Sequence, residues 1–320
     1  MKRIALLTSG GDAPGMNACI RAAVRAALSK GMEVVGIRRG YFGLVNDDVI
    51  EMDDRSVSGI IQRGGTMLFT ARCPEFNTEE GLQKGYDTLK RRGIEGLIVI
   101  GGDGSFRGAR DLTERFGFPT VGIPGTIDND LPYTDFTLGF DTAVNTVVSL
   151  VNNVRDTMTS HERVSVIEVM GRNCGDIALY SGLASGAEII VIPEAPMTLT
   201  EIERRVKASR SSGKSSIIII VAEGVHGFND IVKDLEEELG LSVRTTIIGH
   251  IQRGGAPSMA DRVLACKFAH HAVALLAGGK GGRVVGVSGG SIVDFGITEA
   301  LKTERPMDMY MYKLAGILAR

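Results

Sequence analysis

The stretch PGTIDNDLPYTDF, from Pro124 to Phe136, places two carboxylates, Asp128 and Asp130, on either side of a single asparagine. If the chain is extended there, both side chains point to the same side of it. Two neighbouring carboxylates can divide labour, because one accepts a proton while the other holds a metal ion or orients a donor. A hydroxyl group that attacks a phosphoryl group needs such a base. The alternative is a polar loop whose acids cap its own backbone.

Two glycine-rich segments follow predicted strands and are suited to bind phosphate. TSGGDAPG, residues 8–15, leads into a helical pattern, and GGDGS, residues 101–105, repeats this arrangement. Glycine lets backbone N–H groups approach an anion, and a helix N-terminus adds positive potential. Asp103 between two glycines could hold Mg²⁺, which prefers carboxylate and phosphate oxygens. The alternatives are an ordinary strand-to-helix turn for the first segment, and an Asx turn or a helix cap for the second.

Cationic side chains are also predicted near strand ends, at Arg163, Arg172, Arg244, His250 and Arg253. Together they could bind a dianionic phosphate on a sugar, with arginine giving forked hydrogen bonds. Glu223, which follows a strand of four isoleucines, could accept hydrogen bonds from sugar hydroxyls. Each residue alone also fits a plainer role, as a solvated arginine, a structural histidine or a glutamate in a salt bridge.

Short apolar segments alternate with helical patterns along the whole chain. The predicted strands are Arg3–Leu7, Glu33–Ile37, Leu97–Ile100, Thr120–Ile123, Val164–Val169, Ile189–Ile192, Ile217–Ala222, Thr245–Ile248 and Val284–Val287. The predicted helices are Met16–Ser29, Glu80–Arg91, Phe106–Arg115, Asp141–Met158, Asp176–Ala184, Leu199–Ser209, Asp230–Leu239 and Ala260–Ala277. Strands buried on both faces, alternating with helices, indicate an α/β protein with mainly parallel sheets. We expect two three-layer α/β/α domains rather than one large sheet, with ligands beyond the carboxyl ends of the strands.

Composition and the N-terminus disfavour several function classes. The 320 residues carry a formal net charge of −2, so a nucleic-acid partner is not expected. No apolar run approaches the roughly 18 residues of a membrane helix. The apolar start of the chain is too short for a signal peptide, so we expect a cytoplasmic protein with no membrane partner. The cysteines at 19, 73, 174 and 266 form no Cys-x-x-Cys pair, which leaves zinc and dithiol chemistry unsupported.

Standard nucleotide-binding fingerprints do not fit the chain. SGKSS, residues 212–216, contains Gly-Lys-Ser, but the P-loop pattern requires glycine where the chain has Ala208. The segment GGDGSFRG departs from the G-x-G-x-x-G spacing at Arg107. A nucleotide site in this chain must therefore use a different glycine pattern.

Several long motifs occur in a fixed order along the chain: LTSGGDAPGMN, GGDGS, PGTIDND, TSHER, MGRNCGD and GHIQRGG. Taken together they resemble the motifs of the bacterial ATP-dependent 6-phosphofructokinase family. The resemblance runs from Lys2 to the C-terminal helix. It implies phosphoryl transfer from MgATP to the 1-hydroxyl of D-fructose 6-phosphate, which gives ADP and fructose 1,6-bisphosphate in the committed step of glycolysis.

The resemblance also implies roles for individual residues. Asp128 would be the base for the sugar hydroxyl, and Asp103 would bind Mg²⁺. Thr126 and Asp130 would belong to the reacting centre, and Arg72 and Arg172 would stabilise charge on the moving phosphoryl group. The residues implied to bind ATP are Gly11, Arg72, Cys73, Gly102, Asp103, Gly104 and Ser105. Those implied to bind the sugar phosphate are Thr126, Ile127, Asp128, Arg163, Met170, Gly171, Arg172, Glu223, Arg244, His250 and Arg253.

Assembly and regulation are implied as well. Arg163 and Arg244 would reach the site of a neighbouring subunit in a homotetramer. An effector site for ADP as activator or phosphoenolpyruvate as inhibitor would use Arg21, Arg25, Arg155, Gly186, Glu188 and Lys214. Basic residues typical of that site are replaced by Asp54, Ser212 and Ser216. Fewer positive charges bind an anion less strongly, so we expect a retained but weakened effector site.

The phosphoryl donor is predicted from two glycines. Diphosphate-dependent relatives carry aspartate where this chain has Gly104 and lysine where it has Gly125. A carboxylate at 104 would repel the inner phosphate of a nucleotide, and a lysine at 125 would favour diphosphate. We therefore expect ATP to be the donor.

The family pattern also predicts how the chain divides. The larger, ATP-binding domain would contain residues 1–138 and 256–302, and the smaller, sugar-phosphate-binding domain residues 139–255 and 303–320. Two alternative functions stay open, a diphosphate-dependent enzyme and a nucleotide-sensing subunit without catalysis. The residues that speak against the second are Asp103, Asp128, Asp130 and Arg172, because a non-catalytic relative would not need all of them.

Overall fold

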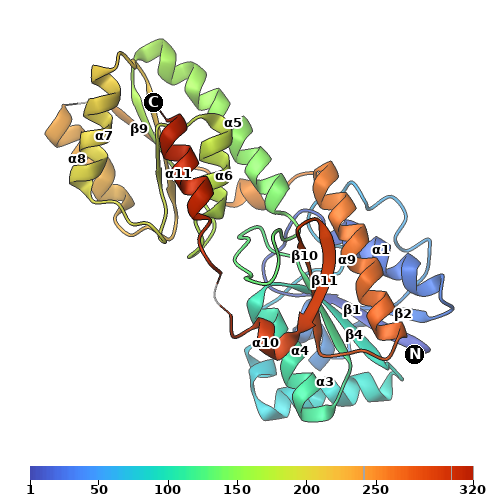
Figure 1. Ribbon diagram of the computed structural model, residues 1–320. Coiled ribbons are helices and arrows are strands. Elements are labelled where there is room, and N and C mark those ends of the chain that lie inside the picture. The colour runs from blue at the N-terminus through green and yellow to red at the C-terminus, as the bar shows by residue number, and fades with distance from the viewer. Residues whose placement is uncertain (241, 304, 320) are drawn as a thin grey trace. The chain divides into compact units, whose positions relative to one another are not determined.

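The computed structural model describes residues 1–240, 242–303 and 305–319, and it contains two compact units (Figure 1). The first unit comprises Met1–Ile127, Leu131–Thr142 and Arg253–Arg305, and the second comprises Asp128–Asp130, Ala143–Gln252 and Pro306–Arg320. Each unit has one sheet with helices on its two faces, which confirms the predicted α/β class. No helix within the described residues is long and apolar enough to cross a membrane.

The first unit has a seven-stranded sheet in the order β11-β10-β5-β4-β1-β2-β3. Its inner strands are parallel, whereas β3 and β11 pair antiparallel with β2 and β10. The strands are β1 (Arg3–Thr8), β2 (Glu33–Ile37), β3 (Val49–Met52), β4 (Gly96–Gly101), β5 (Thr120–Pro124), β10 (Arg283–Ser288) and β11 (Ser291–Gly296). The helices are α1 (Met16–Leu28), α2 (Gly40–Val45), η1 (Pro74–Asn77), α3 (Glu79–Arg91), α4 (Asp103–Phe116), α9 (Met259–Ala277) and α10 (Ile297–Ala300).

Alternating side chains of the first sheet fill two cores. Ala5, Leu7, Val35 and Ile37 belong to a fully buried cluster with residues of α2, α3 and α4. Because successive residues of a strand point to opposite faces, the intervening residues face the other side, where α1 and α9 pack together. Burial on both faces is the reason that these strands are apolar throughout.

The second unit has a four-stranded parallel sheet in the order β7-β8-β6-β9. Its strands are β6 (Val164–Val169), β7 (Ile189–Val191), β8 (Ile217–Ala222) and β9 (Val243–Ile247). Its helices are α5 (Phe140–His161), α6 (Asp176–Ser185), α7 (Leu199–Ser211), α8 (Phe228–Leu239), η2 (Gly249–Arg253) and α11 (Met309–Leu318). One core joins the strands to α7 and α8, and α6 with α11 covers the opposite face.

The predicted strands and helices all occur, with ends shifted by a few residues. The edge strands β3 and β11 and the short helices α2 and α10 were not predicted. The segment α4 begins at Asp103 rather than Phe106, so most of the GGDGS segment is the first turn of a helix and not a loop.

The two units can be compared with the predicted domain boundaries. The chain passes from one unit to the other between residues 142 and 143, 252 and 253, and 305 and 306, whereas the predicted boundaries were 138/139, 255/256 and 302/303. In addition, residues 128–130 group with the second unit although the residues on either side of them belong to the first.

Candidate active site

The predicted phosphate-binding segments of the first unit meet at the carboxyl ends of β1, β4 and β5. The amide of Ser9 donates to the carbonyl of Ile100 at 3.0 Å, and the amide of Gly125 donates to the carbonyl of Gly101 at 2.9 Å. A Cβ atom added to Gly102 would lie 3.8 Å from the Cβ of Thr126. The glycine segments that follow these strands therefore line one edge of the sheet, as expected for a parallel sheet.

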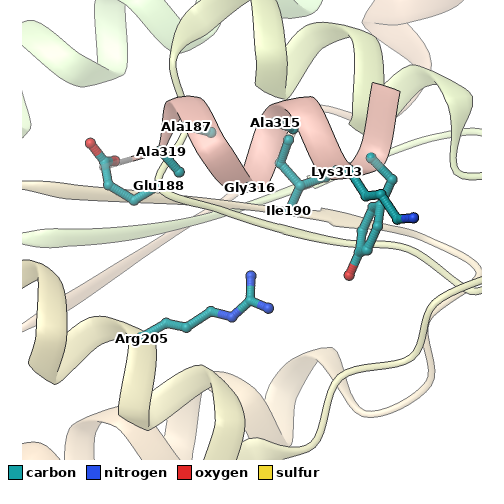
Figure 2. A pocket seen from close by; sticks show the side chains of 9 residues that line it. Ala187, Glu188, Ile190, Arg205, Lys313, Ala315, Gly316 and Ala319 are labelled. Atoms are coloured by element: carbon teal, nitrogen blue, oxygen red, sulfur yellow. The ribbon is translucent and has the colours of Figure 1, made fainter. Parts of the chain in front are cut away.

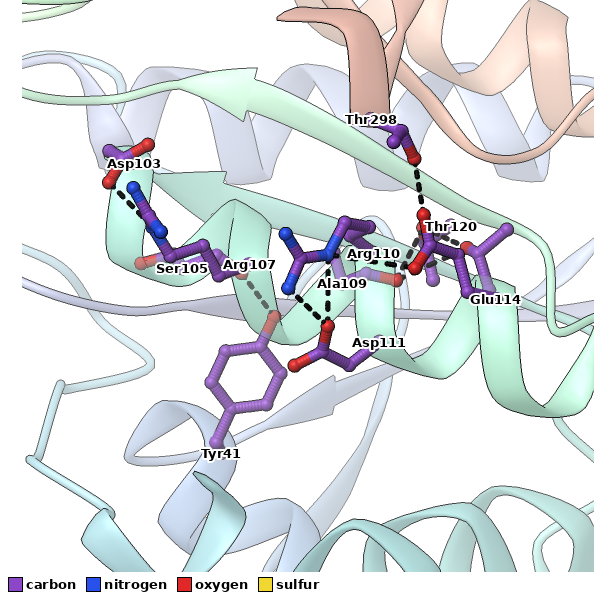
Figure 3. A network of polar contacts seen from close by, with 11 residues as sticks. Tyr41, Asp103, Ser105, Arg107, Ala109, Arg110, Asp111, Glu114, Thr120 and Thr298 are labelled. Atoms are coloured by element: carbon purple, nitrogen blue, oxygen red, sulfur yellow. Dashed lines mark hydrogen bonds and ion pairs between the residues drawn. The ribbon is translucent and has the colours of Figure 1, made fainter. Parts of the chain in front are cut away.

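The start of α4 presents backbone N–H groups at this edge. Gly102 precedes the helix, and no side chain caps it. The amide of Ser105 donates to the carbonyl of Gly102 at 3.0 Å, so the amides of Asp103 and Gly104 are the first-turn donors that suit an anion. Asp103 lies in this first turn, and its Oδ2 accepts a hydrogen bond from Arg107 at 2.9 Å (Figure 3). The buried Tyr41 hydroxyl donates to the carbonyl of Ser105 at 2.5 Å and holds the turn from below.

The remaining ATP candidates border the same glycine segment. The hydroxyl of Thr70 donates to the carbonyl of Gly10 at 2.7 Å, which brings the chain before Arg72 and Cys73 alongside β1. Arg72 is exposed and Cys73 is half-buried against the core. Arg253, predicted to bind the sugar phosphate, lies in the first unit, where its Nη1 donates to the carbonyl of Asp12 at 3.2 Å. A Cβ atom added to Gly11 would lie 2.5 Å from that nitrogen, so a side chain at this position would displace the Arg253 guanidinium.

The carboxylate that was predicted to hold a metal ion at this edge is Asp103. Among the described residues, no group of three or more histidine, cysteine, aspartate or glutamate side chains could hold a metal ion. One carboxylate beside N–H groups that can hold phosphates still suits Mg²⁺, which is commonly bound by one or two carboxylates plus substrate phosphates. The side chain of Asp103 is 40% exposed and so remains accessible to such an ion.

The proposed base belongs to the second unit. The side chain of Asp128 is 1% exposed, and its Oδ2 lies 3.3 Å from Nε of Arg172, whose side chain is 63% exposed. The chain is not extended here, because Asn129 has a left-handed φ of 54°. The parity argument for Asp128 and Asp130 is therefore wrong, although both belong to the same three-residue turn. Thr126 and Ile127, just before this turn, are buried in the first unit.

The segment after β6 is held by backbone hydrogen bonds to one carboxylate. Oε1 of Glu223 accepts from the amides of Gly171 at 3.1 Å and Arg172 at 2.8 Å. Gly171 has a φ of 135°, and a Cβ there would lie 2.4 Å from the carbonyl oxygen of Cys174. Arg172 has a φ of 53°, which costs a residue with a side chain about 1–3 kcal/mol. The Glu223 contacts help to keep this strained segment, and the guanidinium that it carries, in place.

Two carboxylates lie near this segment and repel each other. Burial raises the pKa of Glu168 on β6, and the nearby charge of Glu223 raises it further. A cation or a hydroxyl donor that binds Glu223 would relieve part of this repulsion.

The cationic candidates of the second unit do not all lie at the carboxyl end of its sheet. Arg163 precedes β6, and Arg244 is paired with Ser165 near the start of β9, so both lie at the amino end of the sheet. The six residues of β6 place that end roughly 20 Å from the segment at 170–172. The prediction that these arginines lie near the carboxyl-end loops is therefore wrong within one chain. His250 is exposed on η2, after the carboxyl end of β9, and Met170 is buried after β6.

Part of the predicted effector set forms a connected cluster in the second unit. Nζ of Lys214 lies 3.1 Å from Oε1 of Glu188 and donates to the carbonyl of Ala319 at 2.9 Å. Arg155 lies 3.7 Å from the same Glu188 oxygen and donates to the carbonyl of Gly186 at 2.9 Å. A pocket of about 190 Å³ adjoins Glu188 beneath α11, with Arg205 and Lys313 in its lining (Figure 2).

The other effector candidates lie on α1 in the first unit. Arg21 is half-buried, and Arg25 is exposed with its Nε 4.0 Å from the carboxylate of Asp54. Asp54 stands where the family typically has arginine, so it both removes a cation and partly neutralises Arg25. This contact gives a physical basis for the expected weakening.

Sequence reasoning missed several side chains that hold the second-unit segments, of which Gln252 and Asp176 are buried and Glu194 is exposed. Oε1 of Gln252 accepts from the amide of Met170 at 3.2 Å, and Asp176 accepts from Asn129 at 2.8 Å. Glu194 accepts from the amide of Gly175 at 2.7 Å. Their partners are distant in the chain, so no local pattern could have revealed them.

Known proteins resemble this chain in sequence and in fold. The phosphofructokinase family model matches residues 3–276. The chain is 57% identical over 320 residues to an ATP-dependent 6-phosphofructokinase of Clostridium botulinum strain Hall, and covers 100% of both chains. It superposes on phosphofructokinase from Saccharomyces cerevisiae with a TM-score of 0.89 and 34% identity, over 99% of this chain and 47% of the yeast chain.

The fold is shared by relatives with a different donor. A pyrophosphate-dependent phosphofructokinase from Marinobacter aquaeolei superposes with a TM-score of 0.87 at 22% identity, over 97% of this chain and 86% of that one. At that identity the likeness concerns the fold alone, so the donor must be argued from individual residues. The family match and the full-length identity to curated relatives show that this chain belongs to the phosphofructokinase family.

Proposed function

We propose that this chain is an ATP-dependent 6-phosphofructokinase, which transfers the γ-phosphoryl group of ATP to the 1-hydroxyl of D-fructose 6-phosphate. The observation that carries the proposal is the buried Asp128 carboxylate, 3.3 Å from the Arg172 guanidinium in a member of this family. A carboxylate beside a guanidinium supplies both a proton acceptor and a cation, which phosphoryl transfer requires.

In the proposed reaction, Asp128 takes the proton of the sugar hydroxyl while the hydroxyl oxygen attacks the γ-phosphorus of ATP. The new O–P bond forms while the bond to the ADP oxygen breaks. Arg172 and Arg72 compensate charge on the moving group, and Thr126 and Asp130 complete the reacting centre. Because little covalent chemistry is asked of the protein, the rate depends on positioning and electrostatic stabilisation.

The donor side is built on the first unit. The N–H groups of Gly11 and of residues Gly102 to Gly104 at the start of α4 hold the phosphates of ATP, with Ser105, Arg72 and Cys73 beside them. When Mg²⁺ is bound with ATP, it neutralises phosphate charge, and Asp103 is the carboxylate that would hold it. Gly104 favours ATP, because it places no carboxylate beside the phosphates. A Cβ there would meet nothing within 4 Å, so the fold does not itself require glycine.

The acceptor side uses the segment after β6 and its neighbours. Glu223 fixes the backbone of Gly171 and Arg172, which sets the direction of the Arg172 side chain. Met170, Ile127 and His250 would border the sugar, and Arg253 would reach its phosphate. Arginine binds such a phosphate with forked hydrogen bonds.

The active form is a homotetramer in which Arg163 and Arg244 serve the site of a neighbouring subunit. Their place at the amino end of β6 and β9, opposite the segment at 170–172, supports this assignment. Complementation tests it. Subunits with Asp128→Asn and subunits with Arg244→Ala are each inactive, but mixed and reassembled they regain activity, because some sites then combine two intact halves. Mixtures that stay inactive would contradict shared sites.

The effector site would bind ADP or phosphoenolpyruvate weakly. Arg21, Arg25, Arg155, Gly186, Glu188 and Lys214 form its set, with Asp54 opposing one of its cations. Tight, strongly cooperative inhibition by phosphoenolpyruvate would contradict this part of the proposal.

A coupled assay for fructose 1,6-bisphosphate tests the reaction itself, with ATP and diphosphate compared as donors in the presence of Mg²⁺. Rapid product formation with ATP and little with diphosphate is the expected result. Product with diphosphate alone would keep the site but overturn the donor assignment. No product with either donor would favour a nucleotide-sensing subunit. The cytoplasmic location remains a prediction, tested by cell fractionation.

A further inference from the structure

Asn129 is a fully buried polar residue between the two carboxylates of the turn at 128–130. Its side-chain Nδ2 donates a hydrogen bond to Oδ2 of Asp176 at 2.8 Å, across 47 positions of the chain. Asp176 is itself only 7% exposed and is the first residue of α6. A buried hydrogen bond to a charged acceptor is among the stronger polar contacts in a protein.

The backbone of Asn129 reinforces this contact. Its φ of 54° is left-handed, a conformation that asparagine and aspartate tolerate better than other residues with side chains. Its carbonyl oxygen faces the thiol of Cys174, with sulfur and oxygen 3.9 Å apart. The side chain and the carbonyl of one residue therefore both contact the segment 174–176, which Glu194 holds through the amide of Gly175.

The turn at 128–130 is thus joined to the segment 172–176 by two contacts, an outer one and an inner one. The outer link is the ion pair of Asp128 with the exposed Arg172, at 3.3 Å. The inner link, from Asn129 to Asp176, is buried and lies away from solvent. Since residues 127 and 131 belong to the first unit, the inner link is a buried anchor of the base to the unit that carries Arg172 and Glu223.

We propose that Asn129 and Asp176 are positioning residues that set the Asp128 carboxylate for proton transfer from the sugar hydroxyl. The inference rests on the proposed function and extends it to residues with no contact to the substrate. A displacement of a catalytic group by about 1 Å can cost about 100-fold in rate, so a buried contact that fixes the turn would affect kcat. The wild-type assay described above tests the reaction separately.

The experiment measures kcat and KM for both substrates in Asn129→Asp, Asp176→Asn and the exchanged double variant. Asn129→Asp is nearly isosteric and keeps the left-handed backbone accessible, but it removes the donor and faces Asp176 with a like charge. Asp176→Asn keeps the shape and removes the charged acceptor. In the double variant the donor and acceptor have exchanged places, so the hydrogen bond can re-form with the total charge unchanged.

We expect each single variant to lower kcat by about 10- to 100-fold with KM for ATP changed less than about twofold, because the ATP-binding groups belong to the first unit. The double variant should exceed Asn129→Asp in kcat by at least about fivefold. A purely structural role would instead lower thermal stability and the fraction of active enzyme, with kcat per folded molecule unchanged. Active-site titration and thermal unfolding of every variant separate the two.

Asn129→Gly serves if Asn129→Asp does not fold, because glycine adopts a φ of 54° without strain and removes the side chain that donates to Asp176. Wild-type kcat in folded Asp176→Asn or Asn129→Gly would overturn the inference while leaving the proposed reaction intact. A double variant whose loss in kcat equals the product of the two single losses would also overturn the inference.

Discussion

Replacing Gly104 by aspartate is expected to weaken the use of ATP while leaving the folded protein intact. Gly104 is exposed in the first turn of α4, and a Cβ atom built on it meets nothing within 4 Å. Its φ lies outside the left-handed range, so a side chain brings no backbone strain. A carboxylate in the first turn of a helix gains about 0.3–1 kcal/mol from the helix dipole, so unfolding stability should be unchanged or slightly higher.

The expected cost to ATP comes from like charges. At about 5 Å and an effective dielectric constant of about 20, two unit charges repel each other by about 3 kcal/mol. Solvent at this exposed position reduces the repulsion to about 1–2 kcal/mol, which corresponds to about a 5- to 30-fold loss in kcat/KM for ATP. Fructose 6-phosphate binding should not change, because Gly104 is not one of the residues assigned to the sugar phosphate and a side chain there meets no other residue within 4 Å.

The assay compares initial rates over a range of ATP concentrations for wild type, Gly104→Asp and the matched control Gly104→Asn. Asparagine has nearly the same volume and no charge, so it should lose much less than aspartate. Equal losses in both variants would show that volume, not charge, matters at this position. An unchanged kcat/KM for ATP in folded Gly104→Asp would refute the reasoning about donor choice.

Two further changes test regulation and electrostatics. Lys214→Met should raise the concentrations of ADP and phosphoenolpyruvate that give half of the maximal effect by about tenfold. The reason is that it removes the cation beside Glu188. Lys207→Met is the control, since it removes only an ion pair with Glu203. Glu168→Gln should stabilise the protein near neutral pH. The pKa of Glu168 is raised in the folded state. Its protonated form therefore contributes fully to the free energy of unfolding below about pH 4.5, and this contribution is lost as the pH rises through the folded-state pKa. The gain in urea unfolding free energy should therefore grow from pH 4.5 to 7, and a gain independent of pH would contradict it.

The buried parallel strands could be predicted from sequence because burial on both faces makes them continuously apolar, as in IIIIVA of β8. The edge strand β11 was harder to predict, since its residues are only partly buried. Its one local signal was the two-residue turn Gly289–Gly290, where both residues have positive φ, as in a tight hairpin. The early start of α4 was missed because Gly102 and Gly104 suggested a loop.

The site could be predicted only where its residues follow strands. Asp103 and Asp128 were identified as chemical candidates by their neighbours along the chain. The placement of Arg163 and Arg244 depends on which end of a strand they occupy, and the motif alone did not fix it. Gln252 and Asp176 act through partners brought near by the fold, so only coordinates could reveal them.

The role of Asp128 is the central claim, and the variant Asp128→Asn tests it most directly. A steady-state assay should show kcat lowered by about 100- to 10,000-fold, because asparagine cannot accept the hydroxyl proton. Calorimetry should show fructose 6-phosphate and ATP binding within severalfold of wild type. Turnover close to wild type in the folded variant would contradict the assignment of Asp128 as the base.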